Sequence, residues 1–423
     1  MARSMKKIAS LLAVGALSLA GLAACGGSDE PAAGAQAPAA GEDLETTIKI
    51  LAPSYADSTK ADWEAIIAEF NKTYPKVNVE LQVEGWEDFT SKVQARIQAQ
   101  DLPDILNDNQ FALSAESGIL YPIDEVMSAD TLKTIDPALL ENGKGIDGTQ
   151  WAVPDVASAR NLTYNVDILE QAGVEVPKTW ADMENACTAI KEKFPDVYPY
   201  GMPLGQEEAQ IESTLWVWGA GGDWVDGDTL STQTPAVAEG FDEMKKLIDM
   251  GCTQPNAGSS NRADVVDLFN NGKVAMYNGH SGLFSDTPDT IKYDAAPIPS
   301  KDGEPVAVGV TDFIVAFNNG DEDRKAATAA FLDLFYSDAM YTAWYKPTGL
   351  LPVTTSVIES ESAAADELGK KYFDALPTVR FTPVGTSQWD VLQAALQGGA
   401  GKITESDTQT VLAEIQAQVD AQS

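Results

Sequence analysis

Few residues in this chain have the types and spacing that catalysis requires. His280 is the single histidine, and it precedes Ser281 in the segment Gly279-His280-Ser281-Gly282. A serine nucleophile needs a histidine base whose ring faces it, and side chains of adjacent residues rarely do so. The pair is therefore disfavoured as a catalytic centre, and His280 is interpreted as a loop residue or as a contact to a bound ligand.

Acidic residues are numerous enough to form accidental pairs. The chain contains 64 Asp and Glu, so no single pair of carboxylates is informative about glycoside hydrolysis. One histidine and three cysteines leave no His/Cys cluster for zinc or an iron–sulfur centre. The GxSxG, GxGxxG and P-loop patterns are missing, because the glycine-rich segment 398–403 lacks both the spacing and the Ser/Thr of a phosphate loop. We therefore expect no catalytic residues, metal or cofactor.

The charge of the chain restricts its partners. Against the 64 acidic residues stand 28 Lys and Arg, which gives a formal net charge of −36. Nucleic acid and anionic bilayers both require a basic surface, so neither is an expected partner. The 423 residues are enough for two to three domains with real hydrophobic cores.

Several aromatic residues lie among Gly, Asn and Asp in predicted loops. Trp216 and Trp218 precede Gly219-Ala220-Gly221-Gly222, Trp224 follows that segment, and Trp389 follows Ser387-Gln388. Sugars bind through aromatic faces that stack on their C–H faces and through polar groups that hold their hydroxyls. Each tryptophan is therefore a candidate for sugar stacking, with packing in the core or at its rim as the alternative.

The elements that would position these residues alternate between strand and helix. The period of the apolar residues predicts a strand over 46–52, a helix over 63–74, a strand over 77–83, a helix over 89–97 and a strand opening at 102–106. This order is typical of a parallel sheet with helical crossovers. The first part of the body is therefore α/β.

A second region repeats this pattern. Thr234-Pro235 predicts the start of a helix that Gly251 ends, and 274–277 predicts a strand after a short helix at 265–269. Further helices are predicted over 180–194 and 323–337, and Thr404-x-x-Asp407 predicts a capping box before a final helix that carries Ile415. Cys187 and Cys252 either pair in an oxidising exterior or are two small buried apolar residues.

The first 45 residues read as a leader and a tether. Arg3, Lys6 and Lys7 precede an apolar run from Ile8 to Ala24, as in a secretory signal. The run ends Leu22-Ala23-Ala24-Cys25-Gly26, which resembles a bacterial lipobox, so residues 1–24 are predicted to be a lipoprotein signal peptide and Cys25 to be lipidated. Residues 25–45 lack aromatic and β-branched residues and read as a flexible tether.

From about Thr46 to the C-terminus the chain resembles the family 1 extracellular solute-binding proteins, the carbohydrate-capturing subunits of bacterial ABC importers. The resemblance depends on short fragments in a colinear order. These are Leu102-Pro103-Asp104-Ile105, Ser117 to Asp124, Trp151-Ala152-Val153-Pro154, Leu162 to Asp167, Val174 to Trp180, Gly219 to Asp223, Phe269 to Met276 and Thr348-Gly349-Leu350-Leu351-Pro352.

The resemblance implies a type II periplasmic-binding-protein-like fold, in which two α/β lobes grip the ligand in the cleft between them. By analogy the chain crosses between lobes near 157–162, 309–313 and 347–351. The N-terminal lobe would then comprise residues 46–158 plus 312–347, and the C-terminal lobe residues 160–309 plus 351–423.

The resemblance also suggests residues that line the cleft. The loop after the Pro-Asp strand supplies Asp108, Asn109 and Gln110, and Ser387-Gln388-Trp389 corresponds to a sugar-stacking position. A second stacking position departs from the family pattern, so either His280 acts there or a tryptophan among 216, 218 and 224 replaces it. Four further candidates lie beside predicted strand ends or crossings: Tyr55, Asp155, Arg160 and Asp312.

The implied function is a receptor on the extracellular face of the cytoplasmic membrane, anchored by lipid at Cys25 and monomeric. It would bind a mono- or oligosaccharide and deliver it to an ABC permease driven by a separate ATPase. The alternatives are the same fold with another small polar solute (a polyol, an amino-sugar compound or a glycerol phosphate ester), a secreted glycoside hydrolase or esterase, and a purely structural surface lipoprotein.

Overall fold

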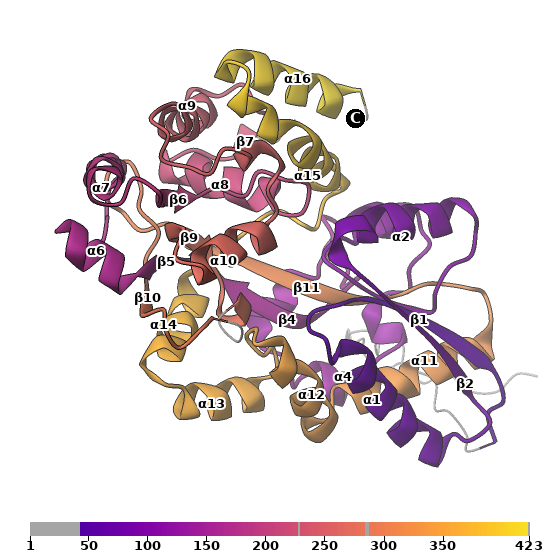
Figure 1. Ribbon diagram of the computed structural model, residues 1–423. Coiled ribbons are helices and arrows are strands. Elements are labelled where there is room, and N and C mark those ends of the chain that lie inside the picture. Colours follow the sequence, from indigo (N-terminus) through magenta and orange to yellow (C-terminus); the bar gives the residue numbers. More distant parts are fainter. Residues whose placement is uncertain (1–42, 227–228, 284–286, 422–423) are drawn as a thin grey trace, which may run out of the picture. The chain divides into compact units, whose positions relative to one another are not determined.

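The computed structural model describes residues 43–226, 229–283 and 287–421 (Figure 1). The predicted signal peptide 1–24, the predicted lipidation at Cys25 and most of the predicted tether 25–45 lie outside the described residues. No helix in the described ranges is both long and apolar enough to cross a membrane.

The larger of the two main sheets has six strands and contains the first strands of the chain. Strand β1 pairs in parallel with β2 on one side and with β3 on the other, as the alternation of strands and helices predicts. β11 then pairs antiparallel with β3 and β4, and β12 pairs in parallel with the start of β11. The bounds are β1 Thr47–Pro53, β2 Asn78–Glu84, β3 Ile105–Asp108, β4 Val153–Ala159, β11 Val308–Ala316 and β12 Arg380–Phe381.

Alternate residues of this sheet enter two different cores. Ile50, Ile105 and Ile314 pack on one face, while Leu51 and Leu106 pack on the other. The first core also includes side chains of α1 Thr59–Thr73, α5 Pro137–Glu141, α11 Glu322–Phe335, α12 Asp338–Tyr345, α13 Thr355–Ala364 and α14 Glu367–Ala375, with Leu132 of α4 Ala129–Leu132 at its edge. The second core includes side chains of α2 Phe89–Gln98 and α3 Ala112–Glu116.

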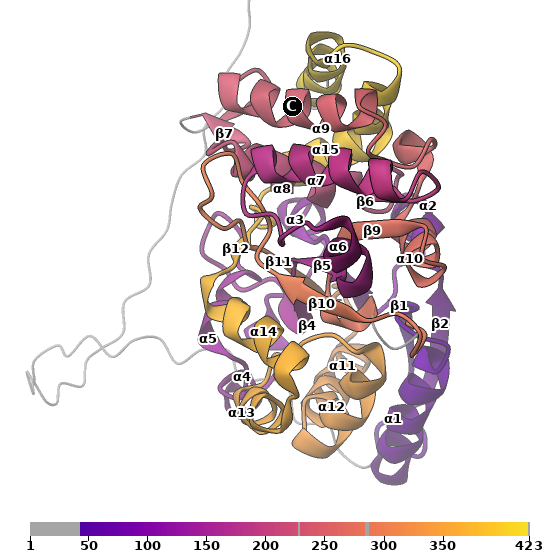
Figure 2. The same ribbon diagram turned by 60° about the vertical axis from the view of Figure 1, so that its left-hand side comes forward.

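The smaller sheet has four strands in the order β10-β5-β9-β6. One face of this sheet packs against α7, α8 and α9, which lie close together in Figure 2. Helix α10 covers the other face. The bounds are β5 Asn161–Asn165, β6 Tyr198–Gly201, β9 Val274–Gly279 and β10 Tyr293–Ala296, with helices α6 Val166–Ala172, α7 Trp180–Lys193, α8 Ala209–Gly219, α9 Pro235–Asp249, α10 Arg262–Asn270, α15 Ser387–Gly399 and α16 Thr408–Asp420. A separate two-stranded sheet joins β7 Val225–Asp226 and β8 Thr229–Leu230.

Cys187 on α7 and Cys252 after α9 form a disulfide, which decides between the two interpretations of this pair. Both residues are buried in the core of the smaller sheet. The disulfide therefore links α7 to the segment after α9 within one core and closes a segment of 65 residues.

The chain passes between the two sheets at Arg160, which separates β4 from β5. This position lies within the range 157–162 over which the first crossing is expected. β11 already belongs to the larger sheet at Val308, before the second crossing expected over 309–313. β12 still belongs to that sheet at Phe381, after the third crossing expected over 347–351. Membership of strands and cores therefore favours a last crossing between Phe381 and Ser387, later than the expected 347–351.

The start of the last helix differs from the sequence prediction. Asp407 is itself the N-cap of α16, and its carboxylate accepts a hydrogen bond from the backbone N–H of Thr410. Thr404 instead lies in the preceding 3₁₀ turn, where its hydroxyl bonds to Gly401 O. The predicted capping box at Thr404 is therefore wrong, because Asp407 can cap the helix alone.

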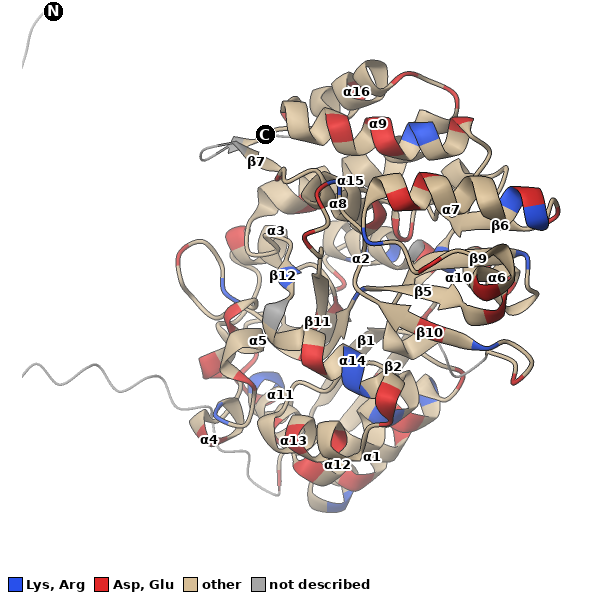
Figure 3. Ribbon diagram, turned by 90° about the vertical axis from the view of Figure 1, so that its left-hand side faces the viewer, with Lys and Arg blue, Asp and Glu red and all other residues tan. Residues whose placement is uncertain are grey.

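Asp and Glu recur along several helices, including α7, α9, α12 and α13 (Figure 3). They are the structural counterpart of the formal charge of −36.

Candidate functional site

A cavity of about 220 Å³ is lined by strand residues of the larger sheet and by residues of the segments around the smaller sheet. Its lining combines polar side chains with large apolar and aromatic ones. The larger sheet and its connections contribute Ser54, Tyr55, Trp86, Asn109, Asn142, Thr311, Asp312, Thr348, Leu350 and Phe381, and the part around the smaller sheet contributes Glu207, Glu208, Gln210, His280, Leu283 and Gln393.

One wall of the cavity is built by Tyr55 and Asp312. Tyr55 follows β1 and Asp312 lies on β11, and the Tyr55 hydroxyl donates a hydrogen bond to Asp312 Oδ2 at 2.9 Å. Burial raises the pKa of Asp312 to about 6, although the Tyr55 hydroxyl and Arg160 lower it. Burial, together with Asp155 and Asp312, raises the pKa of Tyr55 well above its ordinary value, so its hydroxyl keeps its proton.

Two further acids lie behind this wall. Asp155 is fully buried, and its Oδ2 accepts a hydrogen bond from Asn107 Nδ2 at 2.8 Å. Asp108 is also buried and accepts from the backbone N–H of Asn109. Burial raises the pKa of Asp108 to about 8 and, with repulsion from Asp312, raises the pKa of Asp155 well above its ordinary value. Neither side chain lines the cavity, so both can act on a ligand only through their neighbours.

Trp86 supplies the large aromatic surface of the cavity. It opens a single 3₁₀ turn after β2, and its ring meets that of Tyr55 edge to face at 5.7 Å. Trp86 also packs on Phe89 at the start of α2, which fixes the ring while leaving part of it exposed. This wall can offer an aromatic face to a bound molecule.

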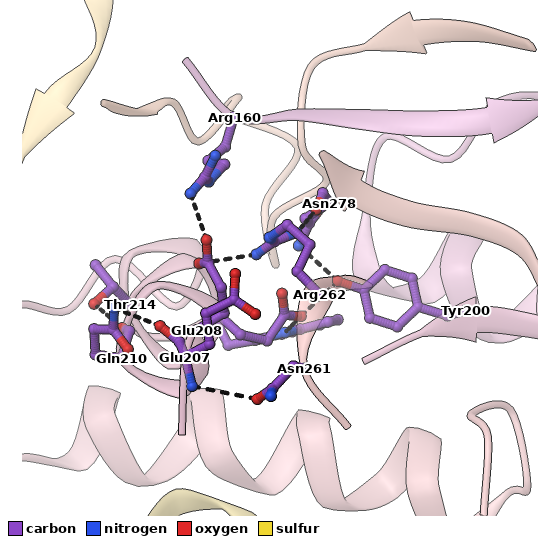
Figure 4. Close-up of polar contacts among 11 residues, drawn as sticks. Arg160, Tyr200, Glu207, Glu208, Gln210, Thr214, Asn261, Arg262 and Asn278 are labelled. Carbon is purple, nitrogen blue, oxygen red and sulfur yellow. Dashed lines mark hydrogen bonds and ion pairs between the residues drawn. The ribbon is translucent and has the colours of Figure 1, made fainter. Parts of the chain in front are cut away.

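Arg160 brings a cation into the cavity. Its guanidinium donates from Nη2 to Glu208 Oε1 at 2.8 Å, and Glu208 in turn meets Arg262 (Figure 4). His280 also lines the cavity, and burial and the charges of Arg160 and Arg262 hold its pKa well below its ordinary value. The imidazole is therefore neutral at pH 7 and offers one donor and one acceptor.

Five of the twelve expected ligand-binding residues line the cavity: Tyr55, Asn109, Arg160, His280 and Asp312. Asp108, Gln110 and Asp155 lie in or beside the same strands but do not line it. The structure therefore brings together the candidates at strand ends and crossings.

The four expected tryptophans lie outside the cavity lining. Trp216, Trp224 and Trp389 are buried in the core of the smaller sheet. Trp218 is buried at the edge of that core, where the Arg380 guanidinium covers its ring at 4.0 Å. None of them lines the cavity: α8 and α15 pack Trp216, Trp218 and Trp389 inward, and Trp224, which precedes β7, is buried in the same core.

Sequence reasoning missed Trp86, Glu207, Glu208, Gln210, Thr311 and Gln393. Trp86 had a detectable signal, since it directly follows Gly85 at the end of a predicted strand, and strand ends meet at one edge of a parallel sheet. Glu207, Glu208 and Gln210 had none, because they lie at the start of a helix without a motif. Within the described residues, no cluster of three or more His, Cys, Asp or Glu could hold a metal ion.

The family model for bacterial extracellular solute-binding proteins matches residues 65–371 of this chain. A Brucella abortus (strain 2308) protein described as a binding protein is 26% identical over 345 residues, which cover 80% of this chain and 83% of that one. The crystal structure of a sugar transporter protein from Arthrobacter chlorophenolicus A6 with bound laminaribiose has a TM-score of 0.77 at 19% identity and covers 89% of this chain and 99% of that one. The structure of UgpB from Mycobacterium tuberculosis in complex with glycerophosphocholine has a TM-score of 0.73 at 20% identity, covering 89% and 98%.

The likeness to these solved structures defines the fold as type II periplasmic-binding-protein-like, with α/β parts built around two sheets. The chain belongs to the family 1 extracellular solute-binding proteins.

Proposed function

We propose that this protein is an extracellular receptor that binds a sugar or oligosaccharide in the cavity between its two sheets. The observation that carries the proposal is the composition of the cavity: Trp86 and Tyr55 supply aromatic surface, and Asp312, Asn109 and Gln210 supply polar groups around it. Sugars combine apolar C–H faces with a ring of hydroxyls, and this lining matches both. The laminaribiose-bound structure of similar fold supports the same ligand class.

Other polar solutes are the second candidate, since the neighbour UgpB was crystallised with glycerophosphocholine. A phosphate group favours arginine or lysine with donors to spare. Among the cavity residues Arg160 is the one Arg or Lys, and the Glu208 carboxylate, which accepts from its Nη2, balances its charge. The excess of carboxylates over cations in the lining therefore favours a neutral sugar over a phosphate ester.

We infer that the bound sugar is passed to an ABC permease whose ATPase is a separate chain. Residues 1–24 would be removed as a signal peptide and Cys25 lipidated, which would hold a monomeric receptor at the outer face of the cytoplasmic membrane. Ligand would favour a closed arrangement of the two lobes, because only there would it touch both of them.

Calorimetric titration tests the proposal. The chain from Gly26 to Ser423 is titrated with mono-, di- and oligosaccharides, and with glycerol phosphate esters and polyols as competing classes. We expect saturable one-to-one binding of at least one sugar. Saturable binding of a phosphate ester or polyol alone would identify that solute, rather than a sugar, as the ligand. If no compound of the panel binds, the proposed receptor function is overturned.

Incubation with the best ligand separates a receptor from an enzyme. A receptor returns the glycan unchanged, whereas a glycoside hydrolase or esterase yields products that chromatography detects. Continuous heat in the calorimeter would also indicate turnover.

A further inference from the structure

Arg160 is held so that part of its guanidinium stays available to a ligand. Its backbone N–H bonds to Val308 O at 2.9 Å, which ties the crossing between the sheets to the start of β11. The residue is 4% exposed, yet Nε and Nη1 meet no acceptor among the described residues, and Arg160 lines the cavity. A buried donor without an acceptor is costly, so these two groups favour any ligand oxygen placed against them.

Glu208 fixes the other side of the same guanidinium. It is the N-cap residue of α8, and its two oxygens are divided between two arginines: Oε1 accepts from Arg160 Nη2 at 2.8 Å and Oε2 from Arg262 Nη2 at 3.0 Å. Burial raises the pKa of Glu208, but the two arginines outweigh burial and lower it. The carboxylate therefore stays ionised while it holds Arg160.

Arg262 completes the arrangement from outside the cavity. It lies at the start of α10, is 2% exposed, and does not line the cavity. Its Nη1 also donates to the backbone oxygen of Asn278 on β9. Figure 4 shows that Arg262 lies between Glu208 and Asn278, so it links α8 to the smaller sheet.

The contacts continue from this point into the core. Asn278 Nδ2 donates to the hydroxyl of Tyr200 at 2.6 Å, and that hydroxyl donates to Glu212 Oε1 at 2.6 Å. Trp216 Nε1 donates to the same oxygen at 2.9 Å. The predicted stacking tryptophan 216 therefore belongs to the support of the site rather than to its surface.

We propose that Arg262 is a positioning residue for the ligand site: it holds the Glu208 carboxylate, and Glu208 aims the Nε and Nη1 groups of Arg160 at separate oxygens of the bound solute. The inference rests on the proposed function, because it names Arg160 as the main donor to that same ligand. The Nε–H and Nη1–H groups lie in one plane but point to different sides of the guanidinium, so each suits a separate oxygen, such as one of the several hydroxyls of a sugar.

Calorimetry of three variants measures the coupling. Arg160→Met is expected to weaken binding of the best sugar by roughly 10- to 100-fold, since a hydrogen bond from a charged donor is lost. Arg262→Met is expected to weaken it roughly tenfold, as supporting hydrogen bonds do at other sites. The double variant should bind no more weakly than Arg160→Met alone, because Arg262 acts through Arg160.

Arg324→Met is the matched control. Arg324 donates to the buried Asp104 at 2.7 Å, also has an Nε without an acceptor among the described residues, and does not line the cavity. The Arg324→Met substitution should lower the free energy of unfolding and leave the affinity for the sugar unchanged. If Arg262→Met does not fold, as judged by thermal unfolding, Arg262→Lys replaces it and should bind with intermediate affinity.

A second readout does not need a ligand. The chain has six arginines, so the Nε–H resonances of ¹⁵N-labelled protein can be assigned by substitution. The Arg160 signal should be sharp in the wild type and in Arg324→Met, and shifted or broadened in Arg262→Met. Additive losses of affinity, or an unchanged Arg160 signal in Arg262→Met, would overturn the positioning role. If the wild type binds no sugar but the resonances behave as expected, the assignment of a sugar as the ligand is overturned and the positioning role of Arg262 is retained.

Discussion

Aromatic side chains in this protein divide into those that fill a core and those that face the cavity. Trp389 is fully buried, whereas Trp86 is half-buried and lines the cavity beside Tyr55. The same residue type therefore has two different roles. Which role a tryptophan takes depends on whether its helix or turn directs it into a core or toward the opening between the sheets.

Substitution of each tryptophan should separate the two roles. Trp86→Ala should weaken sugar binding and change stability little, because part of its ring is exposed. Trp389→Ala should lower the free energy of unfolding by about 3–5 kcal/mol, because it leaves a cavity in the core. Calorimetry and urea unfolding check the pair; a large loss of affinity in folded Trp389→Ala with none in Trp86→Ala would contradict this assignment.

Buried carboxyl groups should make stability fall as pH rises. Burial raises the pKa of Asp108 to about 8, that of Asp390 to about 7 and that of Glu207 to about 7. At pH values between the unfolded pKa of about 4 and these native pKa values, the native chain binds more protons than the unfolded chain. The free energy of unfolding therefore decreases as the pH rises through this range. His280 has the opposite sign, because its native pKa is lowered, but its contribution ends near its unfolded pKa of about 6.5.

Asp108→Asn isolates one of these groups. The carboxylate faces the charges of Asp312 and Asp390 and the backbone N–H groups of Asn109 and Gln110. The variant should be more stable than the wild type at pH 8.5, and the two stabilities should be closer at pH 6.5. The free energy of unfolding of the variant should fall less steeply with pH, by up to about 1.4 kcal/mol per pH unit. Urea unfolding across this range measures it, and parallel curves for the two proteins would contradict the buried, protonated Asp108.

At the scale of elements, helices from one part of the chain are held by carboxylates from another. Glu116 of α3 accepts hydrogen bonds from the backbone N–H and hydroxyl of Ser387 at the start of α15, and Asp390 of α15 accepts from the backbone N–H of Leu113 in α3. Each helix start is thus satisfied by an acid of the other helix. α15 lines the cavity through Gln393, and Asn109, in the segment before α3, lines it as well.

The disulfide between α7 and the segment after α9 should contribute strongly to stability. It closes 65 residues, and restricting an unfolded segment of that length corresponds to about 4 kcal/mol in the chain-entropy description. The double variant Cys187→Ala/Cys252→Ala should therefore unfold at lower urea concentration. Reductant should destabilise the wild type and leave the double variant unchanged; equal sensitivity of both proteins would contradict this prediction.

At the scale of the whole molecule, the acidic surface and the predicted anchor describe how the receptor would work beside a membrane. A net charge of −36 should keep the body away from anionic lipid head groups, so attachment would depend on Cys25 alone. Figure 3 shows acids on several separate helices of the face it presents.

Cys25→Ser should therefore release the protein. In cells that express the full chain, the wild type should partition with the membrane and into detergent, and the variant should appear in the soluble fraction or the medium. Cys187→Ala/Cys252→Ala retains Cys25 and serves as the control. Membrane retention of Cys25→Ser at the wild-type level would contradict the lipid anchor.

The sequence by itself determined the class of fold and most elements. Local periodicity and caps predicted the parallel β1, β2 and β3 and the helix from Pro235, because these depend on residues close in the chain. Family fragments added the cleft, and strand ends indicated Tyr55, Arg160 and Asp312. Only the tertiary structure decided that Trp389 and Trp216 are buried, that Trp86 faces the cavity, that Cys187 pairs with Cys252, and that Arg160 and Arg262 share the Glu208 carboxylate. The physical reason is that these four outcomes depend on contacts between residues far apart in sequence, and burial and pairing are set by what the fold places opposite each side chain rather than by its neighbours along the chain.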